Sequence, residues 1–270
     1  MASNNHVSNE EVDALHKEGA CLSRHQRRED GNKCSHQWQA KEQAKDHPSV
    51  YNYPAYDTLC DKRAGGIFLT ALRGNFPRDY ALEWLGGYWK EKPTHSGKEW
   101  DLGKDGNFDH FAKPYWHNAH HIIPNRALLN AIIDAAKQAK DSRLINLIKA
   151  GLLKAEYNLN DKINMVILPM ERRVAAALAL PRHLKRDEVG PNEKKEFRSH
   201  ADYSKRIENK LVGIMRNYKE TLAKALEPDH QGPPDDISKE ELVELSESTY
   251  SAIIKAGGYI GGKALSALKF

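Results

Sequence analysis

The sequence predicts an α+β protein that is mostly helical and contains two short strands. Apolar residues recur at the three- and four-residue spacing of amphipathic helices in three stretches, 128–136, 144–148 and 203–226. Two short apolar runs, Ile122–Ile123 and 163–168, each end at a proline, and the second has the composition of a buried strand. Helices around a few strands are typical of the α+β class.

The first 115 residues give weaker signals. Residues 1–50 are polar and show few apolar positions at a regular period, so we expect a loosely ordered segment that adds little to the core. Residues 51–115 are rich in aromatic side chains separated by glycine and proline, which predicts short helices and turns on a shared core. A central region at 116–215 and C-terminal helices with a tail at 216–270 complete the expected organisation.

The central region starts with a strand that carries His120 and His121 and stops at Pro124. Asn125 belongs to a residue type that caps helices, and a helix is expected after it. A second, short helix is expected to stop at Gly151. The second strand at 163–168 then follows.

Two long helices are expected in the C-terminal part. The first has one apolar stripe, formed by Tyr203, Ile207, Leu211, Ile214, Met215, Tyr218, Leu222 and Leu226. A linker rich in proline and acidic residues separates it from the final helix, which starts after Ser238. The tail AGGYIGGKALSALKF is Gly-rich and apolar, and we interpret it as a packed terminal helix rather than as a membrane-seeking segment.

Charge and hydropathy narrow the function classes. Lys and Arg outnumber Asp and Glu by only 41 to 37, so composition alone does not indicate a nucleic-acid binder. Five basic residues lie between Met170 and Arg186, and they form either a phosphate-neutralising surface or a solvated basic face: Arg172, Arg173, Arg182, Lys185 and Arg186. No apolar run approaches the roughly 20 residues that a membrane-spanning helix needs. An integral membrane segment is therefore not expected.

The chain has three cysteines, Cys21, Cys34 and Cys60. An odd number argues against a complete disulfide framework and fits synthesis in a reducing compartment. Cys21, His25, Cys34 and His36 have a loose zinc-like spacing. An unligated polar segment is the alternative, because structural zinc sites usually pair their ligands as CxxC or HxxxH. The N-terminus lacks the cationic start and apolar stretch of a secretory signal.

His120 and His121 are the strongest candidates for chemistry. Adjacent residues on a strand point to opposite faces, so two neighbouring histidines seldom do the same job. One imidazole can coordinate a metal ion while its neighbour takes a proton from water. Hydrolysis of a phosphodiester needs both, because a metal stabilises the charge on phosphate and leaving oxygen while a base makes the attacking hydroxide.

Three motifs in this order, AHHIIP at 119–124, NMVILP at 164–169 and SHADYSKRIENKL from Ser199, resemble the AHH nucleases of the HNH, or ββα-metal, superfamily. The resemblance covers roughly residues 116–215 and implies a small ββα-metal core within the helical fold. It implies that His120 is a metal ligand, that His121 is the general base and that Asn164 orients this base. His200, which opens a helix, is implied as a further ligand.

The third protein ligand departs from the family pattern. Many relatives carry another histidine four residues before the last one, and here that position is Glu196. We prefer His183, which lies between the second strand and the helix of His200, and Glu196 is the alternative for an ion that favours oxygen. The expected cofactor is one divalent ion, with Mg(II), Mn(II), Zn(II) and Ni(II) left open.

The resemblance also implies a substrate and a biological setting. We expect hydrolysis of DNA with little sequence preference, because no base-reading module flanks the core, and RNA is the alternative substrate. Relatives often serve as toxins in bacterial competition. We therefore expect an antibacterial effector made in the bacterial cytoplasm, delivered into rival cells by a machine such as type VI secretion, and neutralised in the producer by a cognate immunity protein.

Two other functions stay open at this point. One is a non-catalytic, metal-stabilised nucleic-acid-binding module, against which His121 and Asn164 argue, because a purely structural site needs neither a base nor a residue to orient it. The other is an intracellular housekeeping or phage-defence endonuclease, which the sequence does not separate from a toxin.

Overall fold

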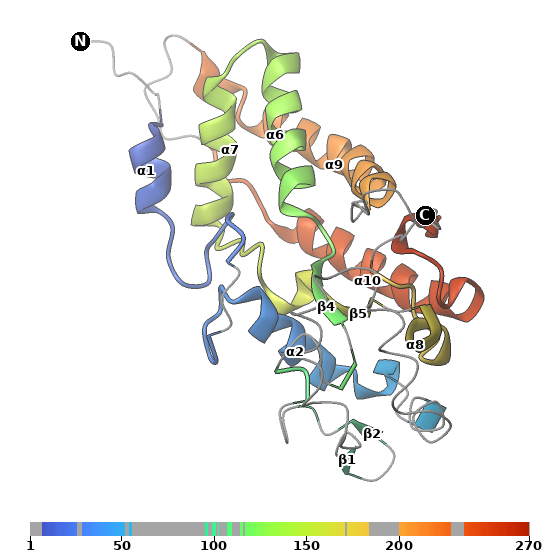
Figure 1. The fold of residues 1–270 in the computed structure, drawn as a ribbon. Coiled ribbons are helices and arrows are strands. Elements are labelled where there is room, and N and C mark those ends of the chain that lie inside the picture. Colours follow the sequence, from blue (N-terminus) through green and yellow to red (C-terminus); the bar gives the residue numbers. More distant parts are fainter. Residues whose placement is uncertain are drawn as a thin grey trace, which may run out of the picture. The chain divides into compact units, whose positions relative to one another are not determined.

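The computed structural model is mostly helical with two small two-stranded sheets in its described part, which confirms the predicted α+β class (Figure 1). The structure describes residues 7–25, 29–51, 54–55, 95–96, 99–100, 102, 107–109, 114–115, 117–170, 172–183, 200–227 and 235–269. Most of the aromatic-rich region expected at 51–115 therefore lies outside the described residues. The chain divides into two compact units, one made of Met1–Gln39, His121–Met165 and Ser204–Tyr250, the other of Ala40–His120, Val166–Tyr203 and Ser251–Phe270.

The first unit is built from helices. α1 (Asn9–Ala14) packs on α7 (Arg143–Lys154), and α7 packs on α6 (Asn125–Ala139), as Figure 1 shows. Val12 and Ala20 form a small apolar cluster with Ala150 and Leu153 of α7. The polar N-terminal segment, despite its weak apolar periodicity, thus adds side chains to the core of this unit.

α6 begins directly after Pro124, whose fixed φ suits the entry to a helix. The expected capping role of Asn125 is wrong, because no side-chain cap bond is made and its Nδ2 donates to the carbonyl of Leu22 at 2.7 Å. The apolar positions face inward as predicted, with Leu128 and Ile132 both buried. Asn125 therefore ties the N-terminal segment to α6.

The expected helix stop at Gly151 is also wrong, since α7 continues to Lys154. A Cβ on Gly151 would lie 2.7 Å from Cγ1 of Ile237, so the glycine makes room for that side chain. The chain then turns at Glu156, which has a positive φ of 55°. It leads through the 3₁₀ turn η2 (Lys162–Asn164) into β5 (Met165–Pro169).

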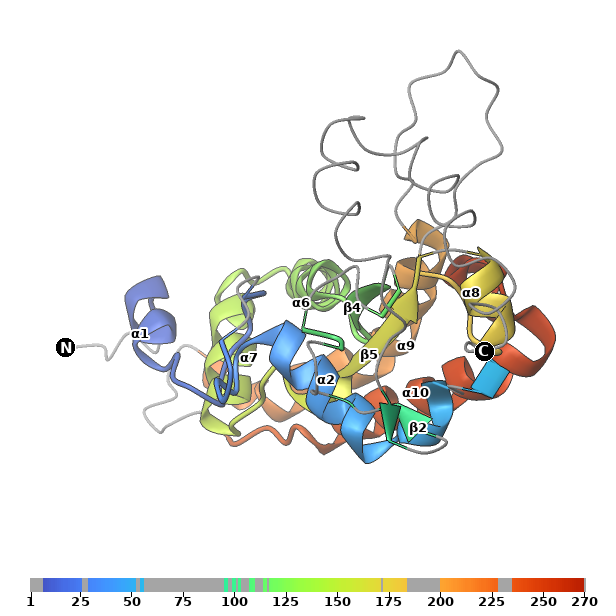
Figure 2. The same ribbon diagram turned by 60° about the horizontal axis from the view of Figure 1, so that its bottom comes forward.

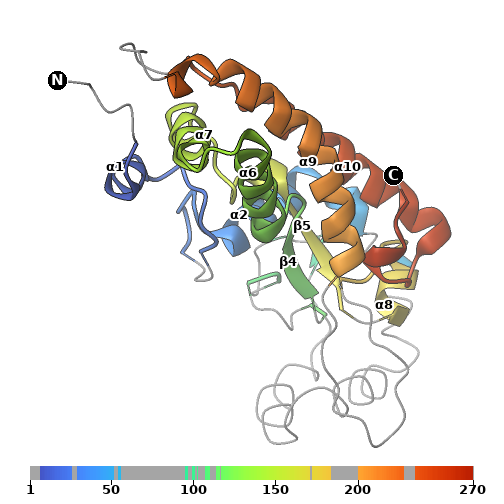
Figure 3. The ribbon, with the colours of Figure 1, turned by 90° about the horizontal axis from the view of Figure 1, so that it is seen from above.

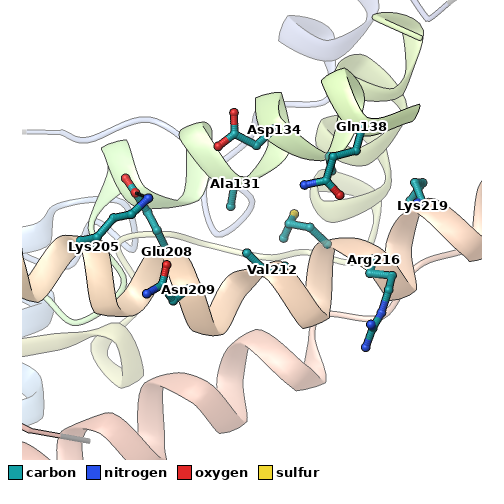
Figure 4. A pocket seen from close by; sticks show the side chains of 11 residues that line it. Ala131, Asp134, Gln138, Lys205, Glu208, Asn209, Val212, Arg216 and Lys219 are labelled. Atoms are coloured by element: carbon teal, nitrogen blue, oxygen red, sulfur yellow. Dashed lines mark hydrogen bonds and ion pairs between the residues drawn. The ribbon is translucent and has the colours of Figure 1, made fainter. Parts of the chain in front are cut away.

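α9 (Ala201–Thr221) follows the predicted apolar stripe. Its buried residues are Tyr203, Ile207, Leu211, Met215 and Tyr218. α6 lies beside α9 (Figure 3), and Asn130 Nδ2 donates to Glu208 Oε1 at 2.7 Å between them. The two helices border a groove whose lining mixes acidic, basic and amide side chains around the exposed Val212 (Figure 4). This mixed charge offers no basic track for a phosphate backbone.

The second unit holds the sheets. β1 (His95–Ser96) pairs with β2 (Glu99–Trp100) in an antiparallel sheet, and β4 (His117–His121) pairs with β5 (Figure 2). Most of α2 (His36–Asp46), the turn η1 (Pro48–Tyr51) and α8 (Arg172–Ala177) also belong here. Every residue of β5 is buried, so this strand contributes to the core.

The Gly-rich tail packs against the end of α8. α10 (Glu240–Ile260) runs into the tail, and a Cβ on Gly257 would lie 1.5 Å from the carbonyl oxygen of Ala179, so only glycine permits this approach. Beyond the helix, Arg182 N donates to Lys263 O and Leu265 N donates to Arg182 O, both at 2.8 Å. The tail thereby fixes the backbone directly before His183. Among the described helices, none is long and apolar enough to cross a membrane.

Candidate metal centre

Three histidines of the second unit converge although they are far apart in the sequence. His120 lies in β4, His183 follows α8, and His200 directly precedes α9. One ring nitrogen from each lies within 4.8 Å of the others. The ring centroids are 4.7 to 5.1 Å apart, and His183 Nε2 is 3.0 Å from His120 Nδ1. These are the three residues chosen as ligands from the sequence, and we call them the histidine triad.

Strand pairing, a backbone hydrogen bond and ring packing position the three residues of the histidine triad. His120 is fixed by the pairing of β4 with β5. His183 N donates to the carbonyl of Pro169 at the end of β5, at 2.8 Å. Tyr203, in the first turn of α9, packs its ring on His120 and His200 with centroids 5.2 and 5.9 Å away. Burial raises the pKa of Tyr203 well above its usual value, so this phenol stays neutral beside the histidines.

The donor set of the histidine triad fits a divalent metal ion. Two nitrogens bound to one tetrahedral ion at about 2.0–2.1 Å lie roughly 3.3 Å from each other, close to the separation of the His120 and His183 nitrogens. His120 and His183 are buried and His200 is half-buried, so the nitrogens are partly shielded from bulk water. Three protein ligands leave a coordination position open for water, which is the pattern of catalytic rather than structural sites.

His121 occupies a separate environment in the first unit. Its Nε2 lies 2.9 Å from Asn160 Oδ1, and its ring stacks on that of His36 with centroids 5.4 Å apart. The pKa of His121 is lowered to about 3, mainly by burial and to a smaller extent by the charges of His36 and Arg24, while the Asn160 hydrogen bond acts in the opposite direction. The imidazole is therefore neutral near pH 7, which is the form that can accept a proton.

The triplet Ala119–His120–His121 lies inside a match to a family model. The model covers residues 102–239, about half of the chain, and is described as a nuclease family of the HNH/ENDO VII superfamily with conserved AHH. The chain belongs to the AHH nuclease family. A search of curated proteins and a search of solved structures gave no match. The chain is thus a nuclease with a nucleic-acid substrate, from a superfamily that is metal-dependent.

In this AHH nuclease, Asn164 fixes the backbone that follows His121. Its Oδ1 accepts from Ile123 N at 2.7 Å and from Ser246 Oγ at 3.1 Å. Its Nδ2 donates to the carbonyls of Leu159 at 2.8 Å and Ile123 at 3.2 Å. Two of these four hydrogen bonds of Asn164 thus go to Ile123, two residues after His121, whereas the side chain that bonds to the His121 ring is Asn160.

Asn160 and His36 are the site residues that sequence reasoning missed. Asn160 lies in the polar turn NLND, where an asparagine is ordinary, and its only distinguishing signal is its place four residues before Asn164. His36 was considered only as a possible zinc ligand. Its Nδ1 instead bonds to the carbonyl of His25, and its ring covers His121.

Other residues singled out in the sequence are only partly described. Glu196, Lys185 and Arg186 lie outside the described residues. Arg172 and Arg173 lie in α8, of whose first two residues only the backbone is described, and Arg182 is half-buried under the tail. A phosphate-binding role for the basic stretch therefore stays a prediction.

Proposed function

We propose that this AHH nuclease is an endonuclease that hydrolyses the phosphodiester bonds of DNA with little sequence preference. The histidine triad is proposed as its metal site and His121 as its general base. The observation that carries the proposal is the convergence of His183 and His200 on His120, the first histidine of the AHH triplet, with a neutral, oriented imidazole at the second.

A metal ion held by the histidine triad would stabilise the negative charge that develops on the phosphate and the leaving oxygen. His121 receives the proton of the attacking water. Asn160 Nδ2 donates to the carbonyl of Ser23 at 2.8 Å, so its Oδ1 accepts from Nε2–H of His121. The lone pair of His121 then lies on Nδ1, the atom to be protonated. A bound phosphodiester anion raises the pKa of this imidazole and makes it a stronger base.

The donor set also favours some metals over others. Imidazole nitrogen suits Zn(II) and Ni(II), whereas Mg(II) and Mn(II) prefer oxygen ligands. We propose His183 as the third ligand and, with three imidazoles, Zn(II) or Ni(II) as the ion. If Glu196 replaces His183 in the functional enzyme, Mg(II) or Mn(II) becomes the better partner.

The test is cleavage of supercoiled plasmid and of a structured RNA by the full chain. The protein is stripped with EDTA and then supplied with Zn(II), Ni(II), Mn(II) or Mg(II) in turn. We expect nicked and linear plasmid only with added metal, and a rate roughly 10²- to 10⁴-fold lower for His121→Ala, the usual contribution of general-base catalysis. Full-rate cleavage by His121→Ala would remove this residue from the mechanism, and cleavage of RNA alone would overturn the DNA assignment.

We further propose that the enzyme is an antibacterial toxin delivered into rival cells, for example by type VI secretion, with an immunity protein in the producer. This proposal is supported by the resemblance to toxin nucleases. Cytoplasmic expression in a bacterium should degrade the chromosome and stop growth, whereas His121→Ala should be harmless. Co-expression of neighbouring reading frames, one at a time, identifies the immunity partner by restored growth. Intact nucleoids at high expression would contradict the toxin proposal. The plasmid assay would then still test whether the protein cleaves DNA.

A further inference from the structure

The N-terminal segment gathers two cysteines and two histidines outside the AHH match. Ligand atoms of His16, Cys21 and Cys34 all lie within 4.8 Å of one another. His25 Nε2 lies 3.1 Å from Cys21 Sγ, and the rings of His16 and His25 stack nearly parallel with centroids 5.5 Å apart. We call these four residues the N-terminal cluster. All of them belong to the first unit and are distinct from the histidine triad.

Two tight turns bring the N-terminal cluster together. Ala20 N donates to Lys17 O at 3.0 Å around Gly19, whose φ of 89° is one that glycine adopts without strain. This turn separates His16 from Cys21. A second turn runs from Glu29 to Asn32 around Gly31, with a φ of 80°, and ends two residues before Cys34. Short turns that each present a ligand are the usual architecture of small zinc sites.

The spacing and chemistry of the N-terminal cluster match a tetrahedral zinc site. Zn–S bonds of about 2.3 Å and Zn–N bonds of about 2.0–2.1 Å place ligand atoms roughly 3.3 to 3.8 Å apart. The ligand atoms of His16, Cys21 and Cys34 lie within 4.8 Å of one another, and His25 adds a nitrogen 3.1 Å from Cys21 Sγ. Cys21 and Cys34 are both buried, and neither forms a disulfide. Two thiols and two imidazoles are the Cys₂His₂ donor set of closed, structural zinc sites.

A metal ion would also compensate for the small apolar core of the segment that carries the N-terminal cluster. Between Leu15 and Ser35 the described chain buries few apolar side chains, Ala20 among them. A short polar segment gains little stability from such a core, and a structural ion supplies folding free energy in its place. Burial and, to a smaller extent, the neighbouring Cys34 raise the pKa of Cys21 to about 12, so this thiol stays protonated in the metal-free chain. A bound cation would stabilise both thiolates.

We propose that His16, Cys21, His25 and Cys34 form a structural zinc site. The set differs from the zinc-like spacing seen in the sequence, because His16 takes the place of His36. The proposal does not depend on the nuclease assignment.

The proposed zinc site is connected to the general-base candidate through Asn160. Cys21 N donates to Tyr157 O at 3.0 Å, and Leu159 N donates to Cys21 O at 2.7 Å. Asn160 Nδ2 donates to Ser23 O and lies 3.7 Å from Cys21 Sγ. An ion that fixes Cys21 therefore also fixes the turn that presents Asn160 to His121.

Cobalt(II) bound to the full chain in place of zinc tests the proposal. Thiolate ligands give cobalt a charge-transfer absorption in the near ultraviolet that imidazole ligands alone do not give, so the two clusters are told apart without measuring activity. We expect this band in the wild-type protein and in His120→Ala, and its loss in Cys21→Ser and Cys34→Ser. Cys60→Ser is the matched control and should keep the band. His16→Ala and His25→Ala should weaken cobalt binding, whereas the exposed His47→Ala should not.

The wild-type spectrum decides the proposal even if a cysteine variant fails to fold. Absence of the charge-transfer band in the reduced, cobalt-loaded wild type would overturn it. A band that persists in Cys21→Ser and Cys34→Ser would also overturn it. Mass spectrometry of the protein purified with thiols blocked provides a second decision: alkylation of Cys21 and Cys34 only after metal removal supports the site, and a Cys21–Cys34 disulfide contradicts it.

Discussion

Asn160 Oδ1 lies 2.9 Å from His121 Nε2, and the other end of the same amide is held by the carbonyl of Ser23. The amide can therefore not rotate without losing a bond, and it selects the tautomer of His121 that carries its lone pair on Nδ1. The base candidate of an AHH nuclease is thus oriented by a residue outside the AHH triplet.

Replacing Asn160 should slow cleavage without loss of metal. In Asn160→Ala the imidazole can turn and change tautomer, so we expect kcat to fall roughly 10- to 100-fold, as for other partners that orient site residues. Metal affinity, measured by calorimetry, should stay unchanged. Asn146→Ala, which also removes one side-chain bond to a carbonyl, that of Val7, should keep the wild-type kcat. Equal loss of kcat in both variants would indicate a general stability effect.

Each member of the histidine triad should contribute to metal affinity. Substitution by alanine removes a ligand, so the affinity should fall by more than the roughly 10- to 100-fold that loss of an outer partner costs. His117→Ala is the control, since His117 is buried on the same strand and packs on Phe108, with a centroid distance of 5.1 Å. If Glu196→Ala lowers the affinity and His183→Ala does not, the third ligand has been assigned incorrectly.

Acid should destabilise the fold through His121. Its pKa is about 3 in the folded chain against a usual value of 6.5. Between these two pH values the unfolded chain binds a proton at His121 and the folded chain does not. The free energy of unfolding is therefore unaffected by His121 well above pH 6.5 and decreases as the pH drops from 6.5 toward 3. Between pH 7.5 and pH 4.5 this one group should cost about 2 to 3 kcal/mol. Burial lowers the pKa of the neighbouring His36 as well, which acts in the same direction.

Urea unfolding at both pH values, in EDTA, measures this effect. His121→Gln has no titrating ring and should lose less stability on acidification than the wild type. An identical loss in the two proteins would show that His121 does not control the acid response.

Alanine substitution of two adjacent glycines of α10 should change the stability of the protein in opposite directions. At Gly257 a Cβ would strike the carbonyl of Ala179, whereas at Gly258 it meets nothing within 4 Å. Gly257→Ala should cost about 1 to 3 kcal/mol and weaken metal binding, because the displaced segment ends at His183. Gly258→Ala should gain up to about 1 kcal/mol from helix propensity. Calorimetric melting and metal titration of both variants check the contrast.

The sequence predicted the features that depend on apolar periodicity or on the order of the three family motifs along the chain. The apolar periodicity of α6 and α9 indicated both helices and their buried faces, since amphipathic spacing directly reflects burial. His120 and His200 were expected from the resemblance to AHH nucleases and His183 from its place between the second strand and the helix of His200, and the structure brings the three together.

The features that the sequence did not predict depend on contacts between segments that are far apart along the chain. Gly151 looks like a helix stop in isolation, and only the side chain of Ile237 explains a glycine inside the helix. Asn160 faces His121 across 39 positions of sequence, and no spacing rule distinguishes it from Asn158 or Asn164. His16 joins the two cysteines because a turn at Gly19 reverses the chain, which the pattern of cysteines and histidines alone does not reveal.

The pairing of Arg182 with Lys263 and Leu265 makes the position of His183 depend on residues near the end of the chain. A growing chain carries the AHH triplet long before it carries the residues that seat His183. Because domains fold as their parts emerge from the ribosome, we expect the histidine triad to reach its final geometry only after residues 257–265 have been synthesised. A nascent nuclease chain that still lacks these residues should therefore bind metal weakly, because the backbone before His183 is not yet held in place.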